Sequence, residues 1–370
     1  MVIDFFQNRL KIKKLQSALE DISAKMSELQ KRNNSMKAVI KSMAEGVIVT
    51  DKSLNILAIN NSAEGIFDIS KKDAEEKFLL EVIPNSEISD IVKKALDNAR
   101  TVSSELVLAM PVSGTFMINA SPIIEAGNVT GCVLVIHDIT ELRKLETMRS
   151  DFVANVSHEL KTPLTSIKGF IETLLDGALK DEKNAKEFLN IVNDHVNRLD
   201  SLVNDLLSLS YLESDKAVLD KGNVKLKGLA DKVILGFSAQ AKKKDVRVIN
   251  DISAGVSVKV DQDKMEQVFT NLIDNAVKFN NSGGSVKISC EDAKNSIKVT
   301  VQDSGPGIPL KDIPRIFERF YRVDKARSRE LGGTGLGLSI VKHIIKLHSG
   351  DAGVESTEGA GSVFWFTLPK

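Results

Sequence analysis

Residues 152–164 read FVANVSHELKTPL, and the interpretation of the whole chain starts from this stretch. It places His158 directly before Glu159, with Thr162 nearly one helical turn beyond the glutamate. A histidine beside a carboxylate is a candidate nucleophile, because the carboxylate can hold one ring N–H and leave the other nitrogen unprotonated. Pro163 cannot donate a backbone hydrogen bond, so we expect it to bend the helix about one turn after His158.

A polar helix face follows in the motif NLIDNAVKF at 271–279. Asn271, Asn275 and Lys278 share one face of the predicted helix, since they lie at i, i+4 and i+7. Amide oxygens are hard ligands that suit Mg²⁺, and an ammonium group suits the charge of a triphosphate. A merely structural polar face is the alternative, but three such side chains amid apolar neighbours would make an unusual core.

Two glycine-rich motifs complete the pattern, DSGPGI at 303–308 and GGTGLGL at 332–338. Asp303 ends a predicted strand, where its carboxylate can accept a hydrogen bond from an exocyclic amine. Gly305 and Gly307 let the backbone approach a base closely. The second motif opens a predicted helix, and free N–H groups at a helix start favour phosphate. The candidate residues of this loop are Gly333, Thr334, Gly335, Leu336 and Gly337.

Between the two glycine motifs lies a basic segment, RIFERFYRVDKARSRELGG, at 315–333. Its cations alternate with Phe317, Phe320 and Tyr321, which predicts a mobile lid whose aromatic rings dock and whose cations meet phosphate. A solvated charged loop is the alternative, favoured for Arg327 and Arg329. The cations are Arg315, Arg319, Arg322, Lys325, Arg327 and Arg329.

The composition is that of a soluble globular chain. The 370 residues suggest two to four domains, and 42% are hydrophobic and 27% charged. The formal net charge is zero, which gives no indication of a nucleic-acid partner. Cys132 and Cys290 are far apart and fit a reducing compartment. Because no apolar run reaches the ~18 residues that span a bilayer, we expect a soluble, cytoplasmic chain, which an upstream membrane sensor could precede.

Heptad repeats mark the N-terminal segment. One apolar seam repeats every seven residues and a second follows three residues behind it, which predicts a parallel two-stranded coiled coil. A single amphipathic helix packed on a neighbouring domain is the alternative. The seams are Phe5, Ile12, Leu19, Met26, Asn33 and Ile40, and Leu15, Ile22, Leu29, Met36 and Met43.

Short strand-like runs and one helix distinguish the next hundred residues or so. Turn residues separate the strand runs GVIVTD, LNILAINN, FMINASPI and GCVLVIHDI, and SEISDIVKKALDNA reads as a helix. We expect an α+β domain, with His137 as a strand residue rather than a haem ligand.

A helical hairpin follows. Its first helix carries His158 and stops near Asp176-Gly177, and its second bears an apolar stripe from Phe188 to Leu209. Stripes this wide cannot be buried by two helices alone, so we expect two hairpins to pair as a four-helix bundle in a homodimer. The last segment alternates strands and helices, which predicts an α/β sandwich of one sheet under a helical layer.

Taken together, these motifs resemble the bacterial sensor histidine kinases of two-component systems, and are similar to the phosphate-responsive and cell-wall-responsive kinases. The resemblance covers about residues 36–370. It implies a multidomain α+β chain in which a PAS domain precedes dimerising phosphoacceptor helices and a GHKL-type ATP-binding domain. The expected domains are a coiled coil at 1–36, the PAS domain at 37–140, the phosphotransfer domain at 141–216 and the ATP-binding domain at 217–370.

The resemblance also implies a reaction. ATP and Mg²⁺ bind the last domain, the γ-phosphoryl group moves to His158, and it then passes to an aspartate of a separate response regulator. By the same resemblance Asn275 is the main Mg²⁺ ligand, Asn271 assists, and Lys278, Tyr321 and Arg322 lie near the nucleotide. Thr162 would position water for phosphatase activity on the regulator.

Two other functions are weighed against this one. A non-catalytic coiled-coil and PAS scaffold would tolerate loss of the motif residues, which are all intact. A gyrase-like or chaperone-like ATPase would not need the histidine motif. The chain contains neither the P-loop pattern GxxxxGK[ST] nor the serine/threonine kinase signature.

Overall fold

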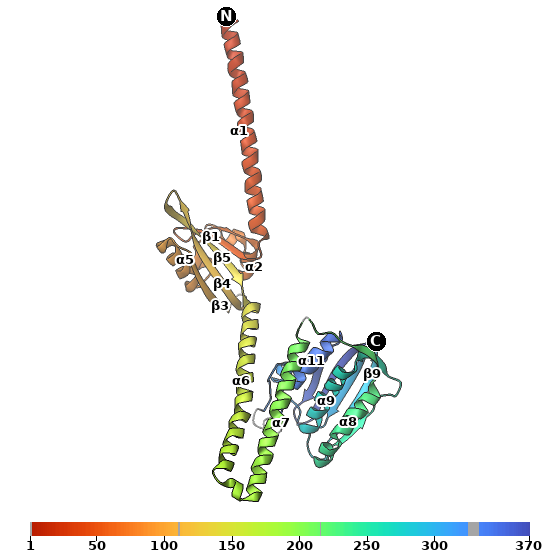
Figure 1. The fold of residues 1–370 in the computed structure, drawn as a ribbon. Helices are drawn as coiled ribbons and strands as arrows, with labels where there is room; N and C mark the ends of the chain where they lie inside the picture. The colour runs from red at the N-terminus through yellow and green to blue at the C-terminus, as the bar shows by residue number, and fades with distance from the viewer. Residues whose placement is uncertain (1, 110–111, 215, 325–332) are drawn as a thin grey trace. The chain divides into compact units, whose positions relative to one another are not determined.

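The computed structural model describes residues 2–109, 112–214, 216–324 and 333–370, with side chains from residue 18 onward within these ranges (Figure 1). The chain divides into two compact units, Met1–Arg149 and Ser150–Lys370, and each has its own hydrophobic core. Among the described residues, no helix has both the length and the apolar character needed to cross a bilayer.

Helix α1 (Val2–Ser42) opens the first unit. The side chains of its predicted seams are exposed, for example Leu19 at 66% and Met36 at 67%. Phe5, Ile12 and Leu15 of the same seams lie outside the described side chains. An unburied apolar stripe calls for a partner surface, and the coiled coil remains a prediction.

The rest of the first unit is built on a five-stranded antiparallel sheet in the order β2-β1-β5-β4-β3. The expected strands and the expected helix α5 are present, and His137 lies on β5 as predicted. Strand β3 carries little signal in the sequence, because VSSELVL is half polar and lies at an edge of the sheet. The elements are β1 (Gly46–Asp51), β2 (Ile56–Ile59), α2 (Asn61–Phe67), α3 (Lys71–Ala74), α4 (Leu79–Val82), α5 (Ser86–Asn98), β3 (Val102–Leu108), β4 (Gly114–Glu125) and β5 (Asn128–Asp138).

Asn60 fixes the way the chain enters this sheet from α1. Its Oδ1 accepts hydrogen bonds from the backbone N–H groups of Val47 at 2.8 Å and Ala63 at 3.0 Å. Its Nδ2 donates to the carbonyl oxygens of Ile40 at 3.0 Å and Glu45 at 2.9 Å. Because this buried amide bonds to both sides of the turn, the direction of α1 is set by four hydrogen bonds rather than by apolar packing alone.

Two long helices, α6 (Thr140–Leu175) and α7 (Glu182–Leu212), form the expected hairpin. Helix α6 continues through Pro163 and ends before Gly177, whose φ of 126° suits a residue without a Cβ. A short turn, η1 (Ala178–Lys180), joins the two helices, and the Asp181 side chain caps α7. Several apolar side chains of the hairpin stay exposed, which leaves the four-helix bundle as a prediction: Leu164, Ile171, Leu175, Leu189, Val196 and Val203.

The C-terminal part of the second unit is a five-stranded sheet in the order β11-β12-β10-β9-β7, with α8, α9 and α11 packed on one face (Figure 1). The predicted sheet under a helical layer is confirmed, and a separate two-stranded sheet, β6-β8, adds to it. Its strands are short, and β6 buries only Val224, so the sequence gives a weak signal there. The elements are β6 (Lys221–Lys225), α8 (Leu226–Lys243), β7 (Arg247–Asn250), β8 (Ser257–Asp261), α9 (Gln262–Lys278), β9 (Ser285–Ala293), β10 (Ser296–Asp303), η2 (Ile313–Arg315), α11 (Gly337–Leu347), β11 (Ala352–Thr357) and β12 (Gly361–Pro369).

A buried histidine links the start of α9 to the end of α11. His348 is 3% exposed, and its Nε2 accepts a hydrogen bond from the backbone N–H of Asp261 at 3.0 Å. Its Nδ1 lies 2.8 Å from the carbonyl oxygen of Ile344, so this nitrogen carries the proton of a neutral ring. Burial lowers the pKa of His348 below its ordinary value of 6.5, and the nearby Lys221 acts in the same direction.

This histidine should make stability depend on pH. The folded state binds the proton of His348 less readily than the unfolded state does. The free energy of unfolding therefore falls as the pH drops below 6.5, while above pH 6.5 this histidine causes no loss of stability. We expect His348→Gln to reduce the loss of stability between about pH 7 and about pH 5 by about 1 kcal/mol. Urea unfolding at several pH values measures this, with His195→Gln as the control. Parallel curves for the wild type and His348→Gln would contradict the assignment.

Candidate active site

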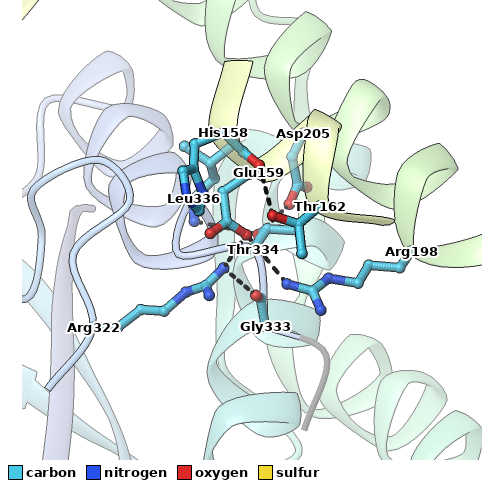
Figure 2. Close-up of polar contacts among 9 residues, drawn as sticks. All are labelled: His158, Glu159, Thr162, Arg198, Asp205, Arg322, Gly333, Thr334 and Leu336. Carbon is cyan, nitrogen blue, oxygen red and sulfur yellow. Dashed lines mark hydrogen bonds and ion pairs between the residues drawn. The ribbon is translucent and has the colours of Figure 1, made fainter. Parts of the chain in front are cut away.

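His158 is exposed on α6, five residues before Pro163. The Thr162 hydroxyl donates to the backbone carbonyl of His158 at 3.1 Å (Figure 2). This is the usual bond of a helical threonine hydroxyl to the carbonyl oxygen four residues before it. His158 is therefore accessible to a second reactant, and Thr162 is one turn away from it.

Glu159 lies inward of His158 and contacts two arginines (Figure 2). Its Oε2 is 3.2 Å from Nη2 of Arg198 on α7 and 3.1 Å from Nη2 of Arg322. The Glu159 side chain is 15% exposed and that of Arg322 only 6%. Arg322 also donates to the carbonyl oxygen of Gly333. The carboxylate beside the candidate nucleophile is thus joined through one guanidinium to the glycine-rich loop.

Helix α9 presents the polar face that the sequence predicts. Lys278 Nζ pairs with Asp274 at 3.0 Å, and the side chain of Asn275 is half-buried. Asn271 lies against the start of α11, where a Cβ built on Gly337 would stand 3.1 Å from its Oδ1. Within the described residues, the buried Nδ2 of Asn271 has no hydrogen-bond partner. An unsatisfied buried amide is costly, which favours a polar ligand at this face.

Asp303 ends β10, and its Oδ1 accepts a hydrogen bond from the backbone N–H of Gly305 at 2.8 Å. Burial raises the pKa of the Asp303 carboxyl, and the backbone N–H groups of Gly305 and Ser362 partly oppose this. Gly307 adopts a φ of 71°, and a Cβ there would overlap the carbonyl oxygen of Thr357. The glycines are therefore required by the tight path of the backbone around this carboxylate.

The glycine-rich loop leads into α11 at Gly337. Gly335 has a φ of 75°, and a Cβ there would lie 2.9 Å from the Cα of Phe320. The Thr334 hydroxyl donates to Asp205 Oδ2 on α7 at 2.7 Å and accepts from the backbone N–H of Leu336 at 3.3 Å. Burial raises the pKa of Asp205, and its bond to Thr334 opposes the rise.

The described first part of the proposed lid, residues 315–324, makes aromatic and ionic contacts. The Tyr321 hydroxyl donates to Asp312 Oδ1 at 2.7 Å, which raises the pKa of Tyr321, and Arg315 stacks 4.4 Å from its ring. Phe320 packs on Phe152 of α6 with ring centroids 5.8 Å apart. Lys325, Arg327, Arg329 and Gly332 lie outside the described residues.

Three charged residues of this region lie outside the sequence motifs: Arg198 and Asp205 on α7, and Glu213 directly after it. Glu213 pairs with Arg319 and lies 3.1 Å from His343 Nε2. The only sequence signal for them is the spacing of Arg198 and Asp205, seven residues apart on an otherwise apolar stripe. That signal indicates a shared helix face and does not identify the partners.

The residues present fit a magnesium–nucleotide complex. The amide oxygens of Asn271 and Asn275 suit Mg²⁺, Lys278 and Arg322 suit phosphate, and the half-buried Asp303 suits the amine of a base. The unsatisfied Nδ2 of Asn271 needs a hydrogen-bond acceptor, which a phosphate oxygen of the nucleotide would supply.

Three family models match the chain. They are "PAS fold" at residues 40–144, "His Kinase A (phospho-acceptor) domain" at residues 148–215, and "Histidine kinase-, DNA gyrase B-, and HSP90-like ATPase" at residues 260–370. Their order along the chain is the order of domain types that the sequence predicts.

Characterised relatives and one solved structure resemble nearly the whole chain. Sensor protein kinase WalK of Staphylococcus aureus (strain Newman) is 37% identical over 366 residues, which are 97% of this chain and 59% of that protein. A second Staphylococcus aureus WalK sequence has the same identity and is covered to 87%. The crystal structure of histidine kinase ThkA in complex with response regulator protein TrrA has a TM-score of 0.51 and 27% identity, covering 90% of this chain and 98% of that one.

Proposed function

The chain belongs to the sensor histidine kinases, and from this premise we propose that it phosphorylates His158 from Mg-ATP and passes the phosphoryl group to an aspartate of a response regulator. The observation that carries the proposal is the chain of contacts from Glu159, beside His158, through Arg322 to Gly333 of the glycine-rich loop. It joins the candidate phosphoacceptor to the candidate nucleotide site within one unit.

Different residues would bind the base, the phosphates and the Mg²⁺ ion. Asp303 accepts a hydrogen bond from the base, with Gly305 and Gly307 bringing the backbone close, while Lys278, Arg322 and the loop Gly333–Gly337 hold phosphate oxygens. Asn275, assisted by Asn271, would hold Mg²⁺, which would neutralise part of the phosphate charge. Tyr321 anchors the lid through Asp312.

The phosphoryl transfer forms one bond to phosphorus and breaks another. A neutral ring nitrogen of His158 attacks the γ-phosphorus, the bond to the bridging oxygen breaks, and ADP leaves. Glu159 withdraws the proton from the other ring nitrogen, which favours the attack. In this structure Glu159 pairs with two arginines, so it must turn from them to serve His158. Transfer onward to aspartate restores the histidine.

We infer the partners and the location partly from the family and partly from this structure. A response regulator is the expected acceptor, since the ThkA structure contains one. The exposed apolar residues of the hairpin support a homodimer. Thr162 supports a phosphatase activity on the regulator, because it lies one turn from His158.

We place the reaction in the cytoplasm, where ATP is present and Cys132 and Cys290 stay reduced. The domain boundaries at 36, 140 and 216 remain proposals from the sequence.

Incubation with γ-labelled ATP and Mg²⁺ tests the proposal. We expect label on the chain that is lost in acid and kept in alkali, because the product is a phosphoramidate. Addition of a cognate receiver domain should move the label to that protein. ATP hydrolysis without labelled chain would instead favour a gyrase-like or chaperone-like ATPase, and neither reaction would favour a non-catalytic scaffold.

Signal transmission should depend on the phase of α6. Leu145 and Met148 form an exposed apolar seam on α6 ahead of His158. Deleting one residue between Thr140 and Met148 turns the preceding part by ~100° about the helix axis, while inserting seven nearly restores its phase. We expect the deletion to change the kinase-to-phosphatase ratio strongly and the insertion weakly. If both leave the ratio unchanged, the signal does not pass through this helix.

A further inference from the structure

Three carboxylates, one on α6, one on α7 and one directly after α7, contact the first part of the proposed lid and the glycine-rich loop that follows it. Glu159 pairs with Arg322 at 3.1 Å, and Asp205 accepts from the Thr334 hydroxyl at 2.7 Å. Glu213 pairs with Arg319. We name Glu159, Asp205 and Glu213 the acid clamp.

The groups that the acid clamp holds are those a triphosphate needs. Arg319 and Arg322 are cations of the lid segment, and Thr334 lies in the loop whose N–H groups should receive phosphate. Carboxylate and phosphate oxygens are alternative acceptors for the same donors. A donor that is bound to the clamp must leave it before it can bind a nucleotide.

The electrostatics of the clamp strengthen this competition. Arg322 is 6% exposed, so its pairing with Glu159 is poorly screened by water. Burial already disfavours the charge on Asp205, and a phosphate group nearby would add like-charge repulsion. Helix α7 also packs on α11, the helix that the glycine-rich loop opens, and His343 of α11 lies 3.1 Å from Glu213.

We propose that Asp205, Glu213 and Glu159 hold the ATP-binding part on the hairpin by binding the donors that a triphosphate would otherwise bind. Docking of the ATP-binding part on the hairpin and nucleotide binding then oppose each other. The inference builds on the proposed function. Linkage then requires that weakening the clamp tightens nucleotide binding and that bound nucleotide loosens the docked arrangement by the same factor. Release of Arg322 would also remove one of the two described arginines that pair with Glu159, leaving Arg198 to hold this carboxylate away from His158, which links occupancy of the site to the start of the reaction.

The test is calorimetric titration of the full chain with a non-hydrolysable ATP analogue and Mg²⁺. Asp205→Asn combined with Glu213→Gln removes two clamp charges without altering His158, Glu159 or the nucleotide motifs. We expect this variant to bind the analogue about five- to tenfold more tightly than the wild type. Asp194→Asn, an exposed neutralisation on the same helix, should bind as the wild type does.

A second readout separates docking from folding. The single variant Glu213→Gln, directly after α7, should show a smaller gain in affinity and a faster labelling of His158, with an unchanged melting temperature. Affinity that is unchanged or weaker in both clamp variants would overturn the inference. Failure of the wild type to bind the analogue at all would overturn the proposed function instead.

Discussion

Replacement of His158 by glutamine is expected to abolish labelling of the chain by γ-labelled ATP, with a loss of about 10³-fold or more. Glutamine keeps a polar side chain on the exposed face of α6 but offers no nucleophilic nitrogen. Among the described residues, the His158 side chain forms no hydrogen bond or ion pair with α9, β10 or α11, so nucleotide affinity should stay within about twofold of the wild type.

His195→Gln is the matched control, since His195 lies on the partner helix α7 and outside every motif. It should label as the wild type does. Labelling that persists in His158→Gln, or that disappears in His195→Gln, would contradict the assignment of the phosphoacceptor.

Replacement of Asp303 by asparagine is expected to weaken ATP binding by about 1–3 kcal/mol, or about five- to 150-fold. The amide can turn a donor toward the amine of the base, which leaves two donors facing each other. The bond from the Gly305 N–H to Oδ1 can persist with the amide oxygen, so the fold should be kept. Calorimetric titration with ATP and with GTP measures both the loss and the change in base preference.

Asp292→Asn on the neighbouring strand β9 is the control, because Asp292 is exposed and pairs with Lys370 away from the motifs. It should bind ATP normally. An Asp303→Asn variant with unchanged affinity and unchanged discrimination against GTP would show that the base is read elsewhere.

The elements that the sequence predicts are those with a clear periodicity. Strands β1, β4, β5, β10 and β12 alternate or run apolar because a core lies against them, and α9 carries a strong apolar stripe. Strands β3, β6 and β11 give little signal for a common reason: each lies at the edge of a sheet or in a two-stranded pair, where polar residues are tolerated.

The candidate site also contains residues that the sequence indicates and residues that it does not. Asn275, Asp303 and Gly335 could be proposed as site residues from the motifs and their resemblance to the family. Arg198, Asp205 and Glu213 could not, because their roles come from partners far away in sequence, such as Thr334 for Asp205. The pairing of Glu159 with Arg322, 163 residues later, likewise depends on how the ATP-binding part meets the hairpin.

The most direct test of the central claim is the position of the phosphoryl group. The wild-type chain, incubated with ATP and Mg²⁺ and digested under alkaline conditions, can be mapped by mass spectrometry. We predict one phosphorylated peptide, which contains His158, with the phosphate on that histidine. Phosphate on His195, His343, a hydroxyl residue or a carboxylate, with His158 unmodified, would contradict the account.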